Sequence, residues 1–239
     1  MSRRLHVPRE RIEAGRARLG DDDLHYLRDV LRLEPGAALE VFDGEGGAYD
    51  ARLSAAGELE LGPRREAPRP AARIALAFAL ARGEKGDLVV QKATELGAAA
   101  LHPFEAERSV VRLDPQRGEE RARRWRKIAA EAARQCGRSE VPEVSAPATL
   151  TAALSAAPAG WRKVVFHETG GVPLASALDP AAPGHLVVTG PEGGLSAREL
   201  AECSAAGAHV ATMGPRVLRA ETAAIAAVAL LQHRLGDLI

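Results

Sequence analysis

Two glycine-containing segments near the carboxyl end of the chain decide its expected fold. Residues 187–195 read VVTGPEGGL, and residues 213–223 read MGPRVLRAETA. After the first segment, Ser196 and Glu199 have the Ser-x-x-Glu spacing of a helix capping box. After the second, an apolar run leads toward the C-terminus. A strand, a glycine loop and a helix in this order place exposed backbone groups around a ligand in α/β proteins, so we expect the two loops to face one pocket.

The glycine spacing excludes the commoner nucleotide-binding motifs. Neither loop contains Gly-x-x-x-x-Gly-Lys-Ser/Thr, which cradles phosphates, or Gly-x-Gly-x-x-Gly, which holds a dinucleotide. A nicotinamide-dependent enzyme is therefore the least favoured class of function.

Strands and helices alternate through the larger, C-terminal part of the chain. Apolar runs predict strands at residues 74–80, 98–103, 163–166, 185–189 and 209–212. Helical patterns occupy residues 87–96 and 116–136, the segment from Ser196, and residues 220–235. This alternation predicts an α/β fold with a mainly parallel sheet covered by helices on both faces.

The first 68 residues show a different pattern. A short helix is predicted over residues 24–33, and strands are predicted at residues 38–42, 48–53 and 59–61. Three prolines within residues 63–70 favour a linker. We therefore expect two domains, a small β-rich one over residues 1–68 and a larger one over residues 69–239.

The composition bears on the cellular location of the protein and on whether it holds a disulfide or a metal. With 46% hydrophobic residues and no apolar run near the ~20 residues that span a bilayer, the chain is expected to be cytoplasmic, with no membrane segment. Its two cysteines, Cys136 and Cys203, form no Cys-x-x-Cys pair. We therefore expect neither a disulfide nor a metal site.

The net charge is zero, so only the distribution of charge bears on RNA binding. Residues 1–20 hold six arginines against two glutamates, and residues 108–138 are also strongly basic. Arginine suits phosphate and base edges, and we expect Arg3, Arg4 and Arg9 to be available to phosphate. A solvated basic N-terminus without RNA contacts is the alternative.

At residues 190–196 (GPEGGLS) and 214–223 (GPRVLRAETA) the chain resembles the 16S ribosomal RNA uracil-N3 methyltransferase family, within the SPOUT, or trefoil-knot, methyltransferases. The resemblance implies S-adenosyl-L-methionine as cofactor and one uridine of 16S rRNA in the small ribosomal subunit as target. It also implies a knotted C-terminal α/β domain, a PUA-like or OB-like β-barrel before it, and a homodimer.

The same resemblance carries over to individual residues. The expected cofactor-binding residues are Thr189, Gly190, Glu192, Gly193, Met213, Gly214, Val217 and Leu218. The expected catalytic residues are Arg138, which ends a family Gln-x-x-Arg motif, and Arg219 beside the second loop. Uracil N3 carries a proton, and an arginine aimed at a carbonyl oxygen would stabilise the charge that develops on the base. For Gly193→Val we expect a side chain where the cofactor sits.

Three questions stay open at this level. The general base is unassigned among Glu192, Glu221 and the pair His167-Glu168. The scaffold is also compatible with another RNA base or a ribose hydroxyl as acceptor, or with a non-catalytic RNA-binding protein. The apolar helix 220–235 fits either a dimer interface or an intramolecular core.

Overall fold

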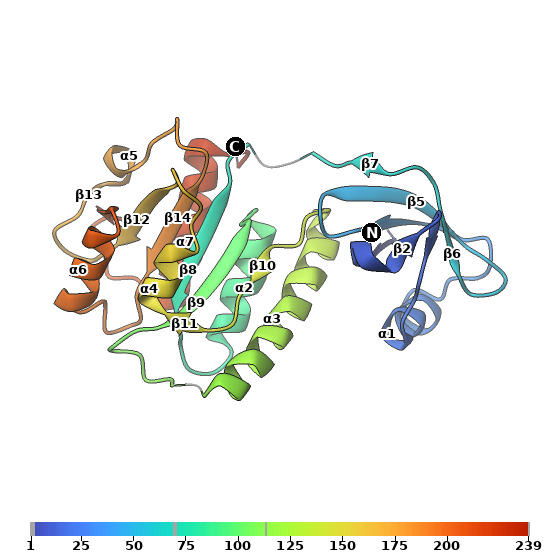
Figure 1. The fold of residues 1–239 in the computed structure, drawn as a ribbon, viewed down its shortest axis with the longest axis horizontal. Helices are drawn as coiled ribbons and strands as arrows, with labels where there is room; N and C mark the ends of the chain where they lie inside the picture. The colour runs from blue at the N-terminus through green and yellow to red at the C-terminus, as the bar shows by residue number, and fades with distance from the viewer. Residues whose placement is uncertain (1–2, 69–70, 113, 239) are drawn as a thin grey trace. The chain divides into compact units, whose positions relative to one another are not determined.

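The computed structural model describes residues 3–68, 71–112 and 114–238, and the chain divides into two compact units. The first unit comprises Met1–Arg69 together with Ala130–Val141. The second comprises Pro70–Ala129 and Pro142–Ile239. Each unit has its own sheet (Figure 1). The inclusion of residues 130–141 in the first unit was not indicated by the sequence pattern.

The first unit is built on a seven-stranded sheet, counted over its described residues. Its strands are β1 (Arg4–His6), β2 (Ile12–Glu13), β3 (Arg16–Ala17), β4 (Ala38–Phe42), β5 (Gly47–Leu53), β6 (Leu59–Leu61) and β7 (Arg65–Glu66). The strand order is β1-β4-β5-β6-β3-β2, with β7 beside β5, and every pair is antiparallel except β1 with β4. The three expected strands are confirmed, and the very short ones were missed because two or three residues carry no periodicity.

The expected helix over residues 24–33 is wrong in its bounds. The helix α1 spans Asp21–His25 and continues as one π-helical turn, η2, over Tyr26–Val30. The Gly20 amide donates a 2.8 Å hydrogen bond to the Asp23 carboxylate, which fixes the earlier start. Arg32 has a φ of 52°, a left-handed conformation that ends the helix. A further short helix, the 3₁₀ turn η1, covers Arg9–Arg11.

Arg4 is not available to phosphate, contrary to the expectation. Its side chain is buried and pairs with Glu40 at 2.6 Å. It also donates hydrogen bonds to the carbonyl oxygens of Ala133 and Arg138 and to the hydroxyl of Ser139. A buried arginine is satisfied by such partners, so Arg4 holds the returning segment onto β1 inside the first unit.

The second unit contains an eight-stranded sheet in which every pair of described strands is parallel. Its strands are β8 (Ile74–Ala79), β9 (Ala100–Glu105), β10 (Glu143–Val144), β11 (Ala148–Thr149), β12 (Arg162–Phe166), β13 (Val172–Pro173), β14 (His185–Thr189) and β15 (Ala208–Thr212). The order is β10-β9-β8-β14-β12-β15-β13, with β11 beside β9. The expected mainly parallel sheet is confirmed.

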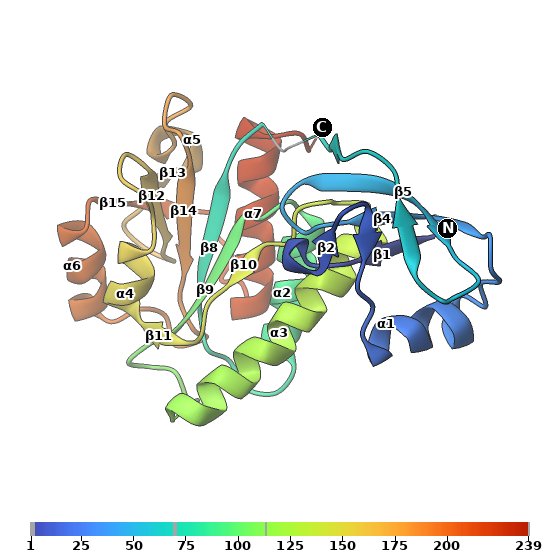
Figure 2. The ribbon, with the colours of Figure 1, turned by 45° about the vertical axis from the view of Figure 1, so that its right-hand side comes forward.

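Helices cover both faces of this sheet (Figure 2). They are α2 (Lys85–Glu95), α3 (Pro115–Cys136), α4 (Leu150–Ser155), α5 (Leu174–Ala177), α6 (Ala197–Ala205) and α7 (Ala220–Leu235). One face carries α4 and α6, which pack over a core that includes Leu154, Val188 and Cys203. The other carries α2 and α7, and the Trp125 ring of α3 meets the Phe78 ring of β8 there.

The terminal helix α7 buries one stripe against its own sheet. Ala224, Ala227, Val228 and Leu231 are buried, and α7 packs on β8, β14 and α2. The amide of the buried Gln232 donates a 3.0 Å hydrogen bond to the carbonyl oxygen of Gly97. Of the two alternatives for this helix, a dimer interface and an intramolecular core, the core accounts for the buried apolar stripe.

Candidate functional site

The first loop leaves the fully buried strand β14 at Thr189 and is folded tightly on itself. The Gly194 amide donates a 2.9 Å hydrogen bond to the Pro191 carbonyl, and Gly194 has a φ of 68°. A Cβ at Gly190 would lie only 3.0 Å from Cγ of Leu195. Glycine is thus required at both ends of this turn, one for conformation and one for space.

The capping box expected after this loop is confirmed. The Ser196 hydroxyl accepts a hydrogen bond from the Glu199 amide at 3.2 Å, and the Ser196 amide donates to the Glu199 carboxylate at 2.8 Å. The second Glu199 oxygen accepts from the Glu107 amide, also at 2.8 Å. Because Glu199 is almost fully buried, these contacts fix the start of α6 and the end of the loop in one geometry.

The second loop connects β15 to α7. The Thr212 hydroxyl accepts a 3.3 Å hydrogen bond from the Gly214 amide, and Gly214 has a φ of 111°, which favours glycine. Arg219 is the N-cap residue of α7 and provides no side-chain cap. The first amides of α7 therefore lack a capping side chain beside the loop.

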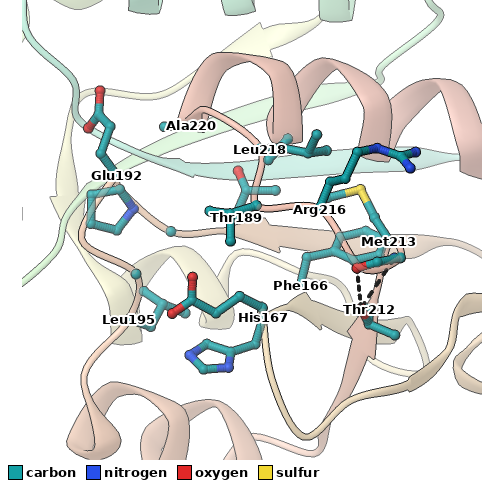
Figure 3. Close-up of a pocket in the computed structure, with 17 residues that line it drawn as sticks. Phe166, His167, Thr189, Glu192, Leu195, Thr212, Met213, Arg216, Leu218 and Ala220 are labelled. Atoms are coloured by element: carbon teal, nitrogen blue, oxygen red, sulfur yellow. Dashed lines mark hydrogen bonds between the residues drawn. The ribbon is translucent and has the colours of Figure 1, made fainter.

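The two loops meet around one pocket because β12 lies between β14 and β15, and all three strands are parallel. Their carboxyl ends lie at the same edge of the sheet, where α/β proteins bind ligands. The pocket contains about 640 Å³ of space, including space open to solvent. Figure 3 shows side chains from the ends of all three strands around it.

Most of the expected cofactor-binding residues line this pocket. They are Thr189, Gly190, Glu192, Met213, Gly214, Val217 and Leu218. Gly193 is absent from the lining, because a Cβ built on it would point to Arg108, with 3.2 Å between the two Cβ atoms. A side chain at Gly193 would therefore meet Arg108, and contact of Gly193 with the cofactor stays a prediction.

Further lining residues were not on the expected cofactor-binding list, and of these Phe166, His167, Glu168 and Thr212 lie outside the two quoted segments. They include Phe166, Pro191, Leu195, Thr212, Arg216, Ala220 and Ala223, and also the pair His167 and Glu168. His167 and Glu168 had been considered as a base, yet their place in the pocket follows from the position of β12 between the two loop-bearing strands. Local sequence carries no signal for that strand order.

The three acidic candidates for a general base have different surroundings. The Glu192 carboxylate accepts a hydrogen bond from the Lys85 ammonium, and this contact lowers the pKa of Glu192. Glu221 lines a smaller cavity behind the pocket and lies 3.4 Å from the same ammonium. Glu168 lines the main pocket and has an exposed side chain. The base itself stays unassigned.

The two expected catalytic arginines lie outside the pocket lining. Arg219 directly precedes the lining residue Ala220 and is exposed, and its positive charge also lowers the pKa of Glu192. Arg138 belongs to the first unit, where its carbonyl oxygen accepts a hydrogen bond from Arg4. The pocket belongs to the second unit, so a catalytic role of Arg138 stays a prediction.

Among the described residues, no group of three or more His, Cys, Asp or Glu side chains is placed to hold a metal ion. A search of the same residues for a helix long and apolar enough to cross a bilayer found none.

Comparison with known proteins agrees with this site. A family described as an RNA methyltransferase domain matches residues 67–232, and an RNA methyltransferase PUA domain matches residues 19–61. Ribosomal RNA small subunit methyltransferase E of Bacillus subtilis (strain 168) is 31% identical, over 89% of this chain and 88% of its own length. The protein of that name from Synechocystis sp. is 34% identical, over 96% of this chain and 77% of its own length.

A solved structure shows the same relationship. Ribosomal RNA small subunit methyltransferase E from Neisseria gonorrhoeae, bound to S-adenosyl methionine, is 29% identical, covers 100% of both chains and has a TM-score of 0.89. A parallel sheet with two glycine loops around a pocket at its carboxyl edge defines an α/β ligand-binding protein. With the family match over residues 67–232, the chain belongs to the RNA methyltransferase family.

Proposed function

We propose that this protein transfers a methyl group from S-adenosyl-L-methionine to N3 of a uridine in the 16S rRNA of the small ribosomal subunit. The observation that carries the proposal is the single pocket formed by the two loops after β14 and β15. Relatives named for ribosomal RNA small subunit methylation, and a neighbour solved with bound S-adenosyl methionine, support the reaction and its cofactor.

The pocket residues fit this cofactor. Thr189 is buried, and its hydroxyl has no hydrogen-bond partner among the described atoms, so it is suited to a polar group of a ligand. Leu195, Met213 and Leu218 supply apolar surface beside the backbone groups of the loops. The carboxylates of Glu168 and Glu192 complement a positively charged sulfur centre.

When bound, the cofactor supplies an electrophilic methyl group on sulfur, and the protein's residues have three tasks. The backbone of the loops orients the ligand, since Gly190 and Gly194 allow the chain to approach it closely. An arginine, for which we propose Arg138 or Arg219, stabilises negative charge on the uracil oxygens. A proton leaves uracil N3, and the side chains in the pocket lining that can accept a proton are those of Glu168, His167 and Glu192.

We propose that the first unit and the basic clusters at residues 1–20 and 108–138 bind the RNA. A PUA domain match over residues 19–61 supports an RNA-holding role for residues 1–68. Some arginines of the N-terminal basic cluster are already neutralised by ion pairs, because Arg11 pairs with Asp23 and Arg18 pairs with Glu13. Arg3 and Arg9 are exposed, and Arg9 donates a hydrogen bond to the Tyr49 hydroxyl and not to a carboxylate, so these two arginines are our candidates for phosphate contacts.

The proposed setting is the cytoplasm, where small subunits are available, and the proposed active form is a homodimer. The dimer follows from family resemblance, and it does not depend on the buried stripe of α7, which packs intramolecularly. Sedimentation of the purified protein at micromolar concentration tests it, with a mass of two chains expected.

The reaction is tested with a labelled methyl donor. Small subunits lacking the modification are incubated with the protein and S-adenosyl-L-methionine that carries an isotopic methyl label, and the digested 16S rRNA is analysed by mass spectrometry. We expect the label on N3 of one uridine. A label on a ribose, on another base, or on no nucleotide would contradict the assignment.

A further inference from the structure

A small second cavity lies behind the first loop, between the end of β8 and the helices α2 and α7. It contains about 240 Å³ of space, including space open to solvent, and it shares Thr189, Gly190 and Ala220 with the cofactor pocket. Lys85 and Glu221 line this cavity and do not line the cofactor pocket. The two cavities are therefore separated by the first loop and the first residue of α7.

One ammonium group connects three elements at this wall. Lys85 is the first residue of α2, and its Nζ donates a hydrogen bond to the carboxylate of Glu192 in the first loop. The same Nζ lies 3.4 Å from a carboxylate oxygen of Glu221, in the first turn of α7. The side chains of Lys85 and Glu221 are 31% and 15% exposed and that of Glu192 is 47% exposed, so water screens the contact with Glu221 less than the contact with Glu192.

The Lys85 ammonium separates two negative charges, those of Glu192 and Glu221. Two carboxylates approach one cation, and the hydrogen bond from Lys85 to Glu192 raises the pKa of Lys85 and lowers the pKa of Glu192. Without the cation, Glu192 and Glu221 would repel each other across the loop. Because Glu221 belongs to a helix packed on the sheet, the loop residue Glu192 is the one that would move.

A second cationic side chain, that of Arg108, also contacts the first loop. The Arg108 guanidinium donates a 2.8 Å hydrogen bond to the carbonyl oxygen of Gly193. Arg108 follows β9, whereas Lys85 begins α2, so the loop is held by cations from two separate elements. Of the two, Lys85 contacts the residue that also lines the cofactor pocket, namely Glu192.

We propose that Lys85 is a positioning residue that ties the first loop to α7 through Glu192 and Glu221, and so holds the cofactor pocket in its binding shape. The inference rests on the proposed function, since it assigns a role in cofactor binding. It adds a residue from outside the two loop motifs, and it gives Glu221 an indirect role through Lys85 in place of proton transfer.

The test compares Lys85→Met with two matched variants, using calorimetry with S-adenosyl-L-methionine and steady-state kinetics on small subunits. Lys85→Met removes the cation and keeps much of the volume, so we expect cofactor affinity to fall about tenfold and KM for the cofactor to rise with it. The kcat at saturating cofactor should stay within about twofold, because positioning is restored when the pocket is filled. Lys85→Arg should recover most of the affinity.

Lys92→Met is the control, because Lys92 lies on the same helix and pairs with Glu95 away from both cavities. We expect unchanged cofactor affinity for it. A Lys85→Met protein that binds the cofactor like Lys92→Met would overturn the inference, while normal methylation by the unmodified protein would leave the proposed function intact.

Glu221→Gln tests the same contact from its other end and does not require Lys85→Met to fold. Glu221→Gln keeps the shape of the side chain, and Glu221 does not line the cofactor pocket. We expect it to weaken cofactor binding about threefold in the unmodified protein. In the Lys85→Met background it should restore part of the lost affinity, because it removes the repulsion between Glu192 and Glu221. If Glu221→Gln alone leaves the affinity unchanged, the proposed tie is contradicted.

Discussion

The guanidinium of Arg108 donates a 2.8 Å hydrogen bond to the carbonyl oxygen of Gly193, and a Cβ at Gly193 would lie 3.2 Å from Cβ of Arg108. Gly193 therefore faces the chain that follows β9, whereas its neighbour Gly194 lines the pocket. The two neighbouring glycines are required for different reasons, spacing against Arg108 in one case and a left-handed φ of 68° in the other.

Valine at these two positions should have unequal effects. We expect Gly193→Val to weaken cofactor binding about fivefold, because the loop or the Arg108 segment must shift slightly. Gly194→Val should weaken it by more than about tenfold, because a β-branched residue is strained at this φ. Calorimetry with S-adenosyl-L-methionine measures both, and a larger loss at Gly193 would contradict this division.

The role of Arg138 is tested by turnover. We expect Arg138→Ala to lower the single-turnover rate on small subunits by about 10² while cofactor affinity stays nearly unchanged, in line with loss of a charge-stabilising donor. Arg138→Lys keeps the charge without the planar fork and should recover only part of the rate. An unchanged rate for Arg138→Ala would remove this residue from the proposed role.

Asp43 should stabilise the first unit in a pH-dependent way. Burial alone would raise its pKa, but hydrogen bonds from the amides of Glu45 and Gly47 and from Arg64 outweigh that effect and hold the pKa below its ordinary value. A carboxyl whose pKa is lowered by folding contributes stability above its unfolded pKa, and this stability is lost as the pH falls below that value.

We therefore expect Asp43→Asn to destabilise the first unit by about 1–3 kcal/mol at pH 7, since buried partners of the carboxylate lose a charged acceptor. The difference from the unmodified protein should shrink below about pH 4. Hydrogen exchange of the β4 and β5 amides in increasing urea, at pH 7 and pH 3, measures this. An equal difference at both values would show that the charge of Asp43 is unimportant.

The two cysteines should differ sharply in reactivity. Cys203 is fully buried in α6, and burial, together with the charges of Glu199 and Glu202, raises the pKa of its thiol to about 11. Cys136 is exposed. At pH 8 we expect iodoacetamide to modify Cys136 alone in the folded protein and both thiols in urea, because the thiolate is the reactive form. Mass spectrometry of the peptides checks this, and rapid labelling of native Cys203 would contradict the packing of α6.

The sequence predicted those features that depend on local pattern. The strands β4, β6 and β14, the helix α7 and the capping box at Ser196 lie where apolar periodicity and capping residues placed them. The start of α1 was missed, because the carboxylate of Asp23 turns back to the Gly20 amide and begins the helix early.

Features that depend on strand order could not be predicted. The position of β12 between β14 and β15 brings Phe166, His167 and Glu168 into the pocket, and no local pattern encodes it. The burial of Arg4 depends in the same way on residues more than 100 positions along the chain. The trefoil knot, implied by the family resemblance, stays a prediction.

The central claim is that the loops after β14 and β15 together hold the methyl donor. A crystal structure of the protein with S-adenosyl-L-methionine tests it most directly. We predict that the bound cofactor contacts both the segment 189–195 and the segment 212–218, with its sulfur centre between them. A cofactor bound elsewhere on the chain, or one that contacts only one of the two segments, would contradict the account.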